Sequence, residues 1–215
     1  MYGRELSAEE IAARAHREAV GGMWDEIGAL QLDFLRAQGL AAPHRLLDVG
    51  CGALRGGVHF VRFLDPGGYH GLDVNPSLIA AGERELVDAG LADRGAHLIV
   101  DDRFAVSRFG QRFEFALAVS LFTHLAMNSI VRCMVEVAKV LAPSGRFFAS
   151  WFEAPKLSST RTPVAFSKDC PISRTASVRL AAALTVRPSA KTPRAEMASA
   201  STRNAAGRPG RARIA

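Results

Sequence analysis

A glycine-dense turn flanked by two acids is the pattern in this chain with the clearest chemical use. The stretch RLLDVGCGALRGG, residues 45–57, passes from an apolar run through Asp48 into the turn, and Asp73 follows 21 residues after Gly52. Glycines let the backbone turn tightly and approach a ligand, and a helix that starts after such a turn directs its first amides at that ligand. A carboxylate such as Asp73 accepts hydrogen bonds from both hydroxyls of a ribose. These residues therefore predict a site for a nucleotide-like cofactor.

Strands and helices alternate along the chain in the order that would position this site. The apolar run at 46–49 is typical of a buried parallel strand, and a helix is predicted from Ala53 to about Leu64. Further strands are predicted at residues 69–74, 97–100, 113–120 and 146–152, with helices at 77–89 and 128–141. Regular alternation of this kind predicts an α/β domain with a doubly wound, mostly parallel sheet.

Two helices are predicted before the turn, at residues 8–20 and 23–38, with Gly21 and Gly22 between them. We therefore expect three parts: a helical cap over residues 1–41, a cofactor-binding domain over 42–155, and a tail over 156–215.

Composition limits the class of protein. The 215 residues are 48% hydrophobic, which supports a globular body, and no apolar run approaches the roughly 18 residues of a membrane span. The three cysteines, Cys51, Cys133 and Cys170, are far apart and form no CxxC pair, so neither a metal site nor a disulfide framework is indicated. A cytoplasmic protein is expected.

The motifs resemble those of the class I S-adenosylmethionine-dependent methyltransferases, which have a Rossmann-like fold. Asp48, Gly50 and Gly52 match the acid-x-Gly-x-Gly pattern of the first motif of that family, and the resemblance extends over residues 42–152. A nicotinamide-binding fingerprint would instead have GxGxxG, whereas this chain has GxGxxxG. The resemblance implies S-adenosyl-L-methionine as cofactor.

The same resemblance assigns roles to individual residues. GLDVNPSLIAAG, residues 71–82, is similar to the second motif, with Asp73 on the ribose and Val74 beside the adenine. VDDRF, residues 100–104, is similar to the third, in which Asp101 or Asp102 binds the adenine amino group; we favour Asp102 and expect Asp101 to cap the next turn. The implied cofactor-binding residues are Asp48, Gly50, Cys51, Gly52, Asp73, Val74, Asp101, Asp102 and Ser120.

The expected reaction is transfer of a methyl group to a small-molecule acceptor by in-line displacement. Alignment of the two reactants is the main task of the protein, because the cofactor already carries an activated methyl group. If the acceptor is a hydroxyl, His124 is the candidate base; the alternative is a surface histidine that moves no proton. Two other functions remain open: a catalytically defective methyltransferase-like protein and an NAD-dependent oxidoreductase.

The tail differs sharply from the rest of the chain. Residues 156–215 contain 12 Lys and Arg against 2 Asp and Glu, whereas residues 1–155 contain 15 against 19. Ala, Arg, Ser, Thr and Pro make up 41 of these 60 residues, so the segment is predicted to be disordered, with a short helix at 178–186 as the exception.

The resemblance implies further strands after the fifth, and we expect these to be missing. The bias of the tail toward Ala, Arg, Ser, Thr and Pro is typical of a GC-rich coding sequence translated out of frame, so we hypothesise a frameshift near residues 153–160. The basic tail is the only feature that suggests nucleic-acid binding, and it lacks interleaved aromatic residues. Nucleic acid and membranes are therefore not expected as partners.

Overall fold

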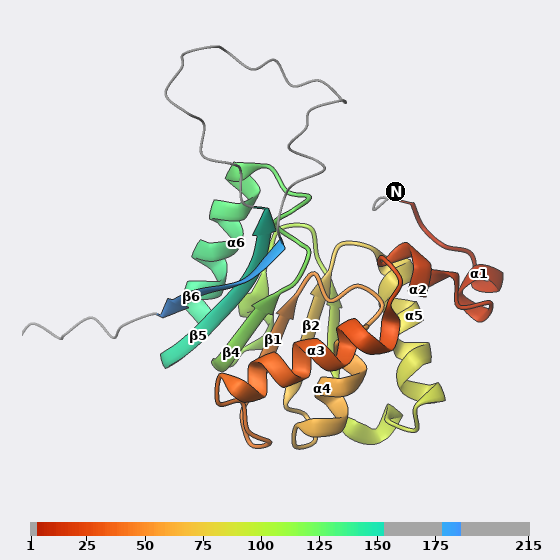
Figure 1. Cartoon of the computed structure of the whole chain (residues 1–215), viewed down its shortest axis with the longest axis horizontal. Helices are drawn as coiled ribbons and strands as arrows, with labels where there is room; N and C mark the ends of the chain where they lie inside the picture. Colours follow the sequence, from red (N-terminus) through yellow and green to blue (C-terminus); the bar gives the residue numbers. More distant parts are fainter. Residues whose placement is uncertain (1–3, 153–177, 186–215) are drawn as a thin grey trace, which may run out of the picture.

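A single mixed sheet forms the centre of the molecule (Figure 1). The computed structural model describes residues 4–152 and 178–185 of the chain. Within them the strand order is β3-β2-β1-β4-β5-β6, with β1 to β5 parallel and β6 antiparallel to β5. The strands are β1 Leu46–Val49, β2 Tyr69–Asp73, β3 His97–Val100, β4 Phe113–Ala118, β5 Leu141–Phe152 and β6 Val178–Thr185. The predicted doubly wound α/β fold is confirmed.

Two helices, α1 and α5, begin where a side chain accepts hydrogen bonds from their first amides. The hydroxyl of Ser7 accepts a hydrogen bond from the Glu10 amide at the start of α1, and the Asn75 side chain accepts from the amides of Ser77 and Leu78 at the start of α5. The helices are α1 Ala8–Ala12, α2 Ala15–Ala19, α3 Trp24–Ala37, α4 Gly57–Phe63, α5 Pro76–Asp88 and α6 Met127–Val140, with short 3-10 turns η1 Ala92–Arg94 and η2 Val106–Phe109.

Two predicted helices are shorter than expected, for a backbone reason. The helix expected over residues 8–20 is divided at Arg14, and the helix expected from Ala53 begins only at Gly57. Arg14 and Leu54 both have left-handed backbone conformations, with φ of 60° and 66°. A residue in that region cannot continue a right-handed helix, so each break is local.

The two faces of the sheet carry separate hydrophobic cores. Neighbouring residues of β1 point to opposite faces: Leu46 packs with residues of α3, α4 and α5, whereas Leu47 packs with residues of α6 and η2. Figure 1 shows α3 and α4 in front of the sheet and α6 at its other side. All four residues of β1 are buried, as expected for a central strand covered on both faces.

The region after β5 departs from the expectation. A short helix was predicted at residues 178–186, but Val178–Thr185 forms β6, with Phe152 opposite Val178 and Arg146 opposite Thr185. At least one strand therefore does follow the fifth, and it covers the edge of β5. The rest of the predicted tail, with the proposed frameshift region at residues 153–160, lies outside the described residues.

Candidate functional site

A cavity of about 230 Å³ lies at the carboxyl ends of β1, β2 and β4. The turn that follows each of these parallel strands forms part of the cavity wall. Doubly wound sheets bind their ligands at this edge, beyond the carboxyl ends of the strands. Eight of the ten sequence-predicted site residues line it, and Asp101 and Asp102 do not. The eight are Asp48, Gly50, Cys51, Gly52, Asp73, Val74, Ser120 and His124.

The glycine turn and the second acid are joined directly. One oxygen of the Asp73 carboxylate accepts a hydrogen bond from the Gly52 amide at 2.9 Å, and the other accepts from the Asn75 amide at 2.9 Å. Gly52 has φ +54° and faces Val20, so a side chain at this position would be strained. A carboxylate has about four acceptor sites, so Asp73 keeps acceptor capacity for the hydroxyls of a diol. Burial raises the pKa of Asp73, although these backbone hydrogen bonds oppose the shift.

Asp48 has a different environment. Its carboxylate is buried and accepts a hydrogen bond from the Tyr69 hydroxyl at 2.8 Å. Burial raises the pKa of Asp48 to about 7, with the Tyr69 bond opposing the shift and the charge of Asp73 adding to it. Asp48 therefore titrates near neutral pH, and it holds β1 to β2 through Tyr69 in addition to lining the cavity.

Cys51 contributes as a buried small residue. Its side chain is 8% exposed, and burial raises the pKa of its thiol well above the ordinary value, so the thiol stays protonated. The Cys51 amide donates to the Leu72 carbonyl at 3.1 Å. The sulfur is thus a packing group, and its backbone shapes the turn.

The turn after β4 brings two further predicted residues to the cavity. Ser120 has a left-handed backbone with φ 58°, and its amide donates to the Ser150 hydroxyl at 2.6 Å. The Thr123 hydroxyl donates to the Ser120 carbonyl at 2.7 Å, which closes the turn that carries His124. Ser150 is fully buried on β5, so a residue far along the chain supports the strained conformation of this turn.

The two adjacent acids after β3 behave differently from each other. Asp101 accepts hydrogen bonds from the amides of Arg103 and Ala105 at 2.8 and 2.9 Å and pairs with Arg108 at 3.3 Å. Its carboxylate therefore caps the turn that follows β3, as expected. Asp102 is exposed and lies 3.7 Å from the Arg103 guanidinium. The geometry thus favours Asp102 over Asp101 for a ligand role, although neither residue lines the cavity.

Eight residues that were not predicted as site residues also line the cavity, among them Val20, Gln31 and Arg55. Val20 and Gln31 come from the N-terminal cap, and Arg55 follows the glycine turn. Gln31 is 6% exposed on α3, in the same helical stripe as the buried Leu35. A polar residue within an apolar stripe is the signal that the sequence offered for Gln31.

The cap is fastened to α5 by a buried ionic cluster. The Glu85 carboxylate accepts two hydrogen bonds from the Arg17 guanidinium, at 2.8 and 2.7 Å, and lies 2.7 Å from His16 Nε2. Burial alone would raise the pKa of Glu85, but the bonds from Arg17 and then His16 lower it below the ordinary value. The Arg17 guanidinium also lies over the Trp24 ring at 4.8 Å. This cluster holds α2, and hence Val20, in place over the turn.

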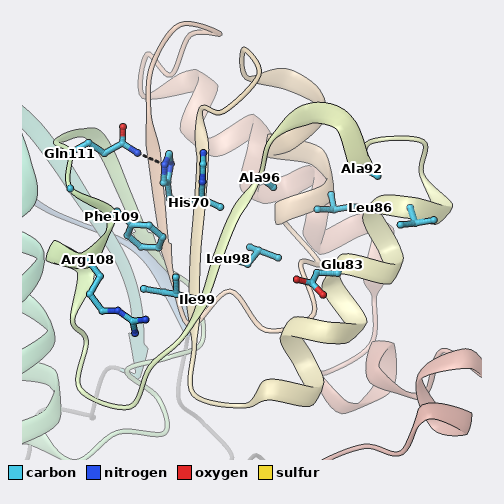
Figure 2. Close-up of a pocket in the computed structure, with 13 residues that line it drawn as sticks. His70, Glu83, Leu86, Ala92, Ala96, Leu98, Ile99, Arg108, Phe109 and Gln111 are labelled. Atoms are coloured by element: carbon cyan, nitrogen blue, oxygen red, sulfur yellow. Dashed lines mark hydrogen bonds between the residues drawn. The ribbon is translucent and has the colours of Figure 1, made fainter.

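A second cavity, of about 830 Å³, lies along the edge strand β3 and contains none of the predicted site residues. Figure 2 shows Phe109 and Gln111 on one side of β3 and Leu98 on the other. His70 also lines this cavity. The His70 ring stacks on the His97 ring with centroids 4.7 Å apart, and the Gln111 amide contacts Nε2 of His70. Burial, followed by the nearby His97, lowers the pKa of His70 to about 4.

Acidification is expected to remove the stabilisation that neutral His70 provides. The folded-state pKa of about 4 lies below the unfolded value of 6.5, so this contribution is fully present above pH 6.5 and is lost as the pH falls toward 4. Between pH 7 and pH 4.5 the loss amounts to about 2 to 3 kcal/mol. In His70→Phe the loss should be absent, as urea denaturation of both proteins at the two pH values would show.

Comparing the two proteins cancels the contributions of other groups. Asp48 in particular acts with the opposite sign, because its pKa is raised on folding. If the free energies of unfolding of wild type and His70→Phe change in parallel with pH, His70 does not carry the effect.

Within residues 4–152 and 178–185, no three His, Cys, Asp or Glu side chains lie together in a way that would hold a metal ion. In the same residues, none of the helices combines the length and the apolar character needed to cross a membrane.

Known proteins share this architecture. Residues 46–145 match the family model described as a methyltransferase domain. The glycopeptide N-methyltransferase MtfA, solved in complex with (S)-adenosyl-L-methionine, is 19% identical with a TM-score of 0.52, over 62% of this chain and 58% of that one. The YcgJ protein from Bacillus subtilis is 19% identical with a TM-score of 0.50, over 58% of this chain and 50% of that one.

The chain thus spans between half and three fifths of these two proteins, and at this identity the likeness concerns the fold. The family match covers β1 and the glycine turn, β2 with Asp73 at its end, and β3 and β4. The matched range therefore includes the three strands, β1, β2 and β4, whose carboxyl ends form the cavity. Residues 46–145 therefore match a methyltransferase domain, and the sheet has the Rossmann-like fold of the class I methyltransferases.

Proposed function

We propose that this protein is an S-adenosylmethionine-dependent methyltransferase that acts on a small-molecule acceptor. The observation that carries the proposal is the bond between the Gly52 amide and the Asp73 carboxylate, at the wall of a cavity over the strand ends. This bond joins the glycine turn to a carboxylate that could accept hydrogen bonds from a ribose, which supports a site for an adenosyl cofactor. The match of residues 46–145 to a methyltransferase domain and the cofactor-bound MtfA structure support the same cofactor.

The lining residues suit the parts of this cofactor. The remaining acceptor sites of Asp73 would take the ribose hydroxyls, and the apolar side chains of Val74 and Leu78 would flank the adenine. The backbone at Gly50 and Ser120 would face the methionine part. The bound cofactor supplies the activated methyl group, so these residues chiefly orient it toward an acceptor. Asp102 would bind the adenine amino group from the neighbouring turn.

His124 is the proposed base for a hydroxyl acceptor. It lies at the rim of the cavity, on the turn after β4, where an acceptor would enter. Although His124 is exposed, the desolvation that remains at the cavity wall lowers its pKa. The imidazole is then neutral at pH 7 and able to accept a proton. A small-molecule acceptor and a cytoplasmic location stay predictions from the sequence.

The proposal is tested by ligand-dependent stability of the full chain. A ligand that binds only the folded state at 100 times its dissociation constant stabilises it by about 2.7 kcal/mol. For a protein of this size that corresponds to a rise in melting temperature of about 5–10 °C. We expect such a rise with S-adenosylmethionine and S-adenosylhomocysteine, and none with NAD or NADH.

The two alternatives give different results in the same experiment. An oxidoreductase would be stabilised by NADH and not by S-adenosylhomocysteine. If millimolar S-adenosylhomocysteine changes neither the melting temperature nor the heat of mixing, the cavity is not an adenosyl site. Turnover is a separate measurement: cofactor binding without methyl transfer to any of a panel of acceptors would favour the catalytically defective protein.

A further inference from the structure

Residues 4–20, the first part of the cap, reach the cavity through Val20. This residue lines the cavity, and its Cγ1 lies 3.3 Å from the position that a Cβ on Gly52 would take, so the segment packs directly on the glycine turn. The cavity measures about 230 Å³, whereas pockets for small molecules and cofactors measure about 300–1,000 Å³. A cofactor over the turn therefore needs more room, and moving Val20 away from Gly52 would supply it.

This segment has little apolar attachment to the rest of the molecule. Among residues 4–20 only His16 is buried. Leu6, Ile11 and Val20 are partly buried and pack on a small cluster that is separate from the two cores of the sheet. Segments with few buried apolar contacts open at a lower cost in free energy than the core does. Release of residues 4–20 therefore requires less energy than unfolding of the sheet.

Polar contacts with α5 hold the segment instead, and Figure 1 shows α2 beside that helix. The strongest is the pair formed by Arg17 and Glu85, in which the guanidinium donates two charge-assisted hydrogen bonds at 2.8 and 2.7 Å. Asp88 pairs with Arg14 at 3.1 Å. Two hydrogen bonds at the start of α5 add to these contacts, from the Leu6 amide to Ser77 and from Asn75 to the Arg4 carbonyl. None of these residues lines the cavity, so the contacts can be weakened without changing its wall.

The connection to α3 has the character of a hinge. Gly21, Gly22 and Met23 follow one another with positive φ, of 99°, 62° and 44°. Helix α3 itself is packed tightly, because a Cβ on Gly28 would lie only 2.4 Å from the Arg55 carbonyl. Hinges are short runs of residues at the ends of elements that absorb a change in φ and ψ. Movement about this connection would displace residues 4–20 and leave α3 in place.

Resting on the proposed function, we infer that residues 4–20 are a lid that opens to admit the cofactor and closes over it, with the Arg17–Glu85 pair as its latch. Lid opening then limits both the entry of S-adenosylmethionine and the release of S-adenosylhomocysteine. Because the latch does not touch the cavity, weakening it raises the open fraction by the same factor with and without ligand. Both rate constants rise together, and the dissociation constant stays nearly unchanged.

Stopped-flow fluorescence of the full chain tests the lid with S-adenosylhomocysteine as the probe. Trp24 is a built-in reporter, since the Arg17 guanidinium lies 4.8 Å from its ring centroid and His16 packs edge-on against it. A Trp151→Phe background removes the other tryptophan. Loss of the Arg17 hydrogen bonds corresponds to about a 10- to 100-fold change in an equilibrium constant. We expect Arg17→Met to raise the association and dissociation rate constants by that factor, with a calorimetric affinity within about threefold of wild type.

Arg62→Met is the matched control, because Arg62 is exposed on α4 and does not line the cavity; its rate constants should equal those of wild type. Glu85→Gln, which keeps the shape of the side chain, should raise both rate constants by a smaller factor and replaces Arg17→Met if that variant does not melt cooperatively. If only one rate constant changes, or neither, the lid is wrong while the cofactor assignment stands. If wild type does not bind S-adenosylhomocysteine at millimolar concentration, the proposed function is wrong, and the lid with it.

Discussion

Replacing Asp73 with alanine is expected to weaken S-adenosylhomocysteine binding by about 100-fold or more. Hydrogen bonds from ribose hydroxyls to an ionised carboxylate contribute about 1.5–3 kcal/mol each, and the substitution removes both. It also removes the acceptor of the Gly52 amide at 2.9 Å, so the turn loses its link to β2. Isothermal titration calorimetry would measure the affinity, and Asp73→Asn, which keeps one carbonyl oxygen, should lose less.

The matched control for this experiment is Asp65→Ala. Asp65 is exposed in the loop before β2, at the opposite end of that strand from Asp73. It changes the net charge of the protein equally but leaves the cavity intact, so its affinity should equal that of wild type. An Asp73→Ala protein that melts cooperatively and still binds S-adenosylhomocysteine within twofold of wild type would rule out the proposed ribose site.

Replacing Glu85 with alanine is expected to lower the free energy of unfolding by about 2–4 kcal/mol, less than for a fully buried ion pair because Arg17 is partly exposed. The substitution leaves the Arg17 guanidinium without its bidentate acceptor and the buried His16 ring without its hydrogen-bond partner, which costs more than the net strength of these bonds. Here the stranded partners are Arg17 and the buried His16, both on α2. Urea denaturation followed by circular dichroism would measure the change.

Two further variants distinguish loss of the contacts with Arg17 and His16 from a general effect of substitutions in α5. Glu83→Ala lies on the exposed side of α5, two residues away, and should change stability by no more than about 0.5 kcal/mol. Glu85→Gln keeps the shape and an acceptor oxygen, so its loss should lie between those of the two alanine variants. Equal stability of Glu85→Ala and Glu83→Ala would show that the cluster does not hold the cap.

Local sequence patterns determined the framework of the site. Apolar runs that end in Asp48 and Asp73, followed by glycines or by a capped helix, indicate parallel strands with ligands at their carboxyl ends. Because parallel strands present these ends at one edge, residues far apart in sequence converge there without further information. The cavity at Gly52 and Asp73, and the turn after β4 that carries His124, follow from this rule.

Only the tertiary structure decided how the cap and the last strand take part. Gln31 reaches the cavity because α3 packs closely on the turn at Gly28, a contact that no spacing within either segment encodes. Residues 178–185, compatible with a helix by composition, form β6 because the edge of β5 offers backbone partners. Local propensity is weak and is overridden by such pairing. Motifs within one segment are readable from sequence, whereas contacts between segments depend on packing.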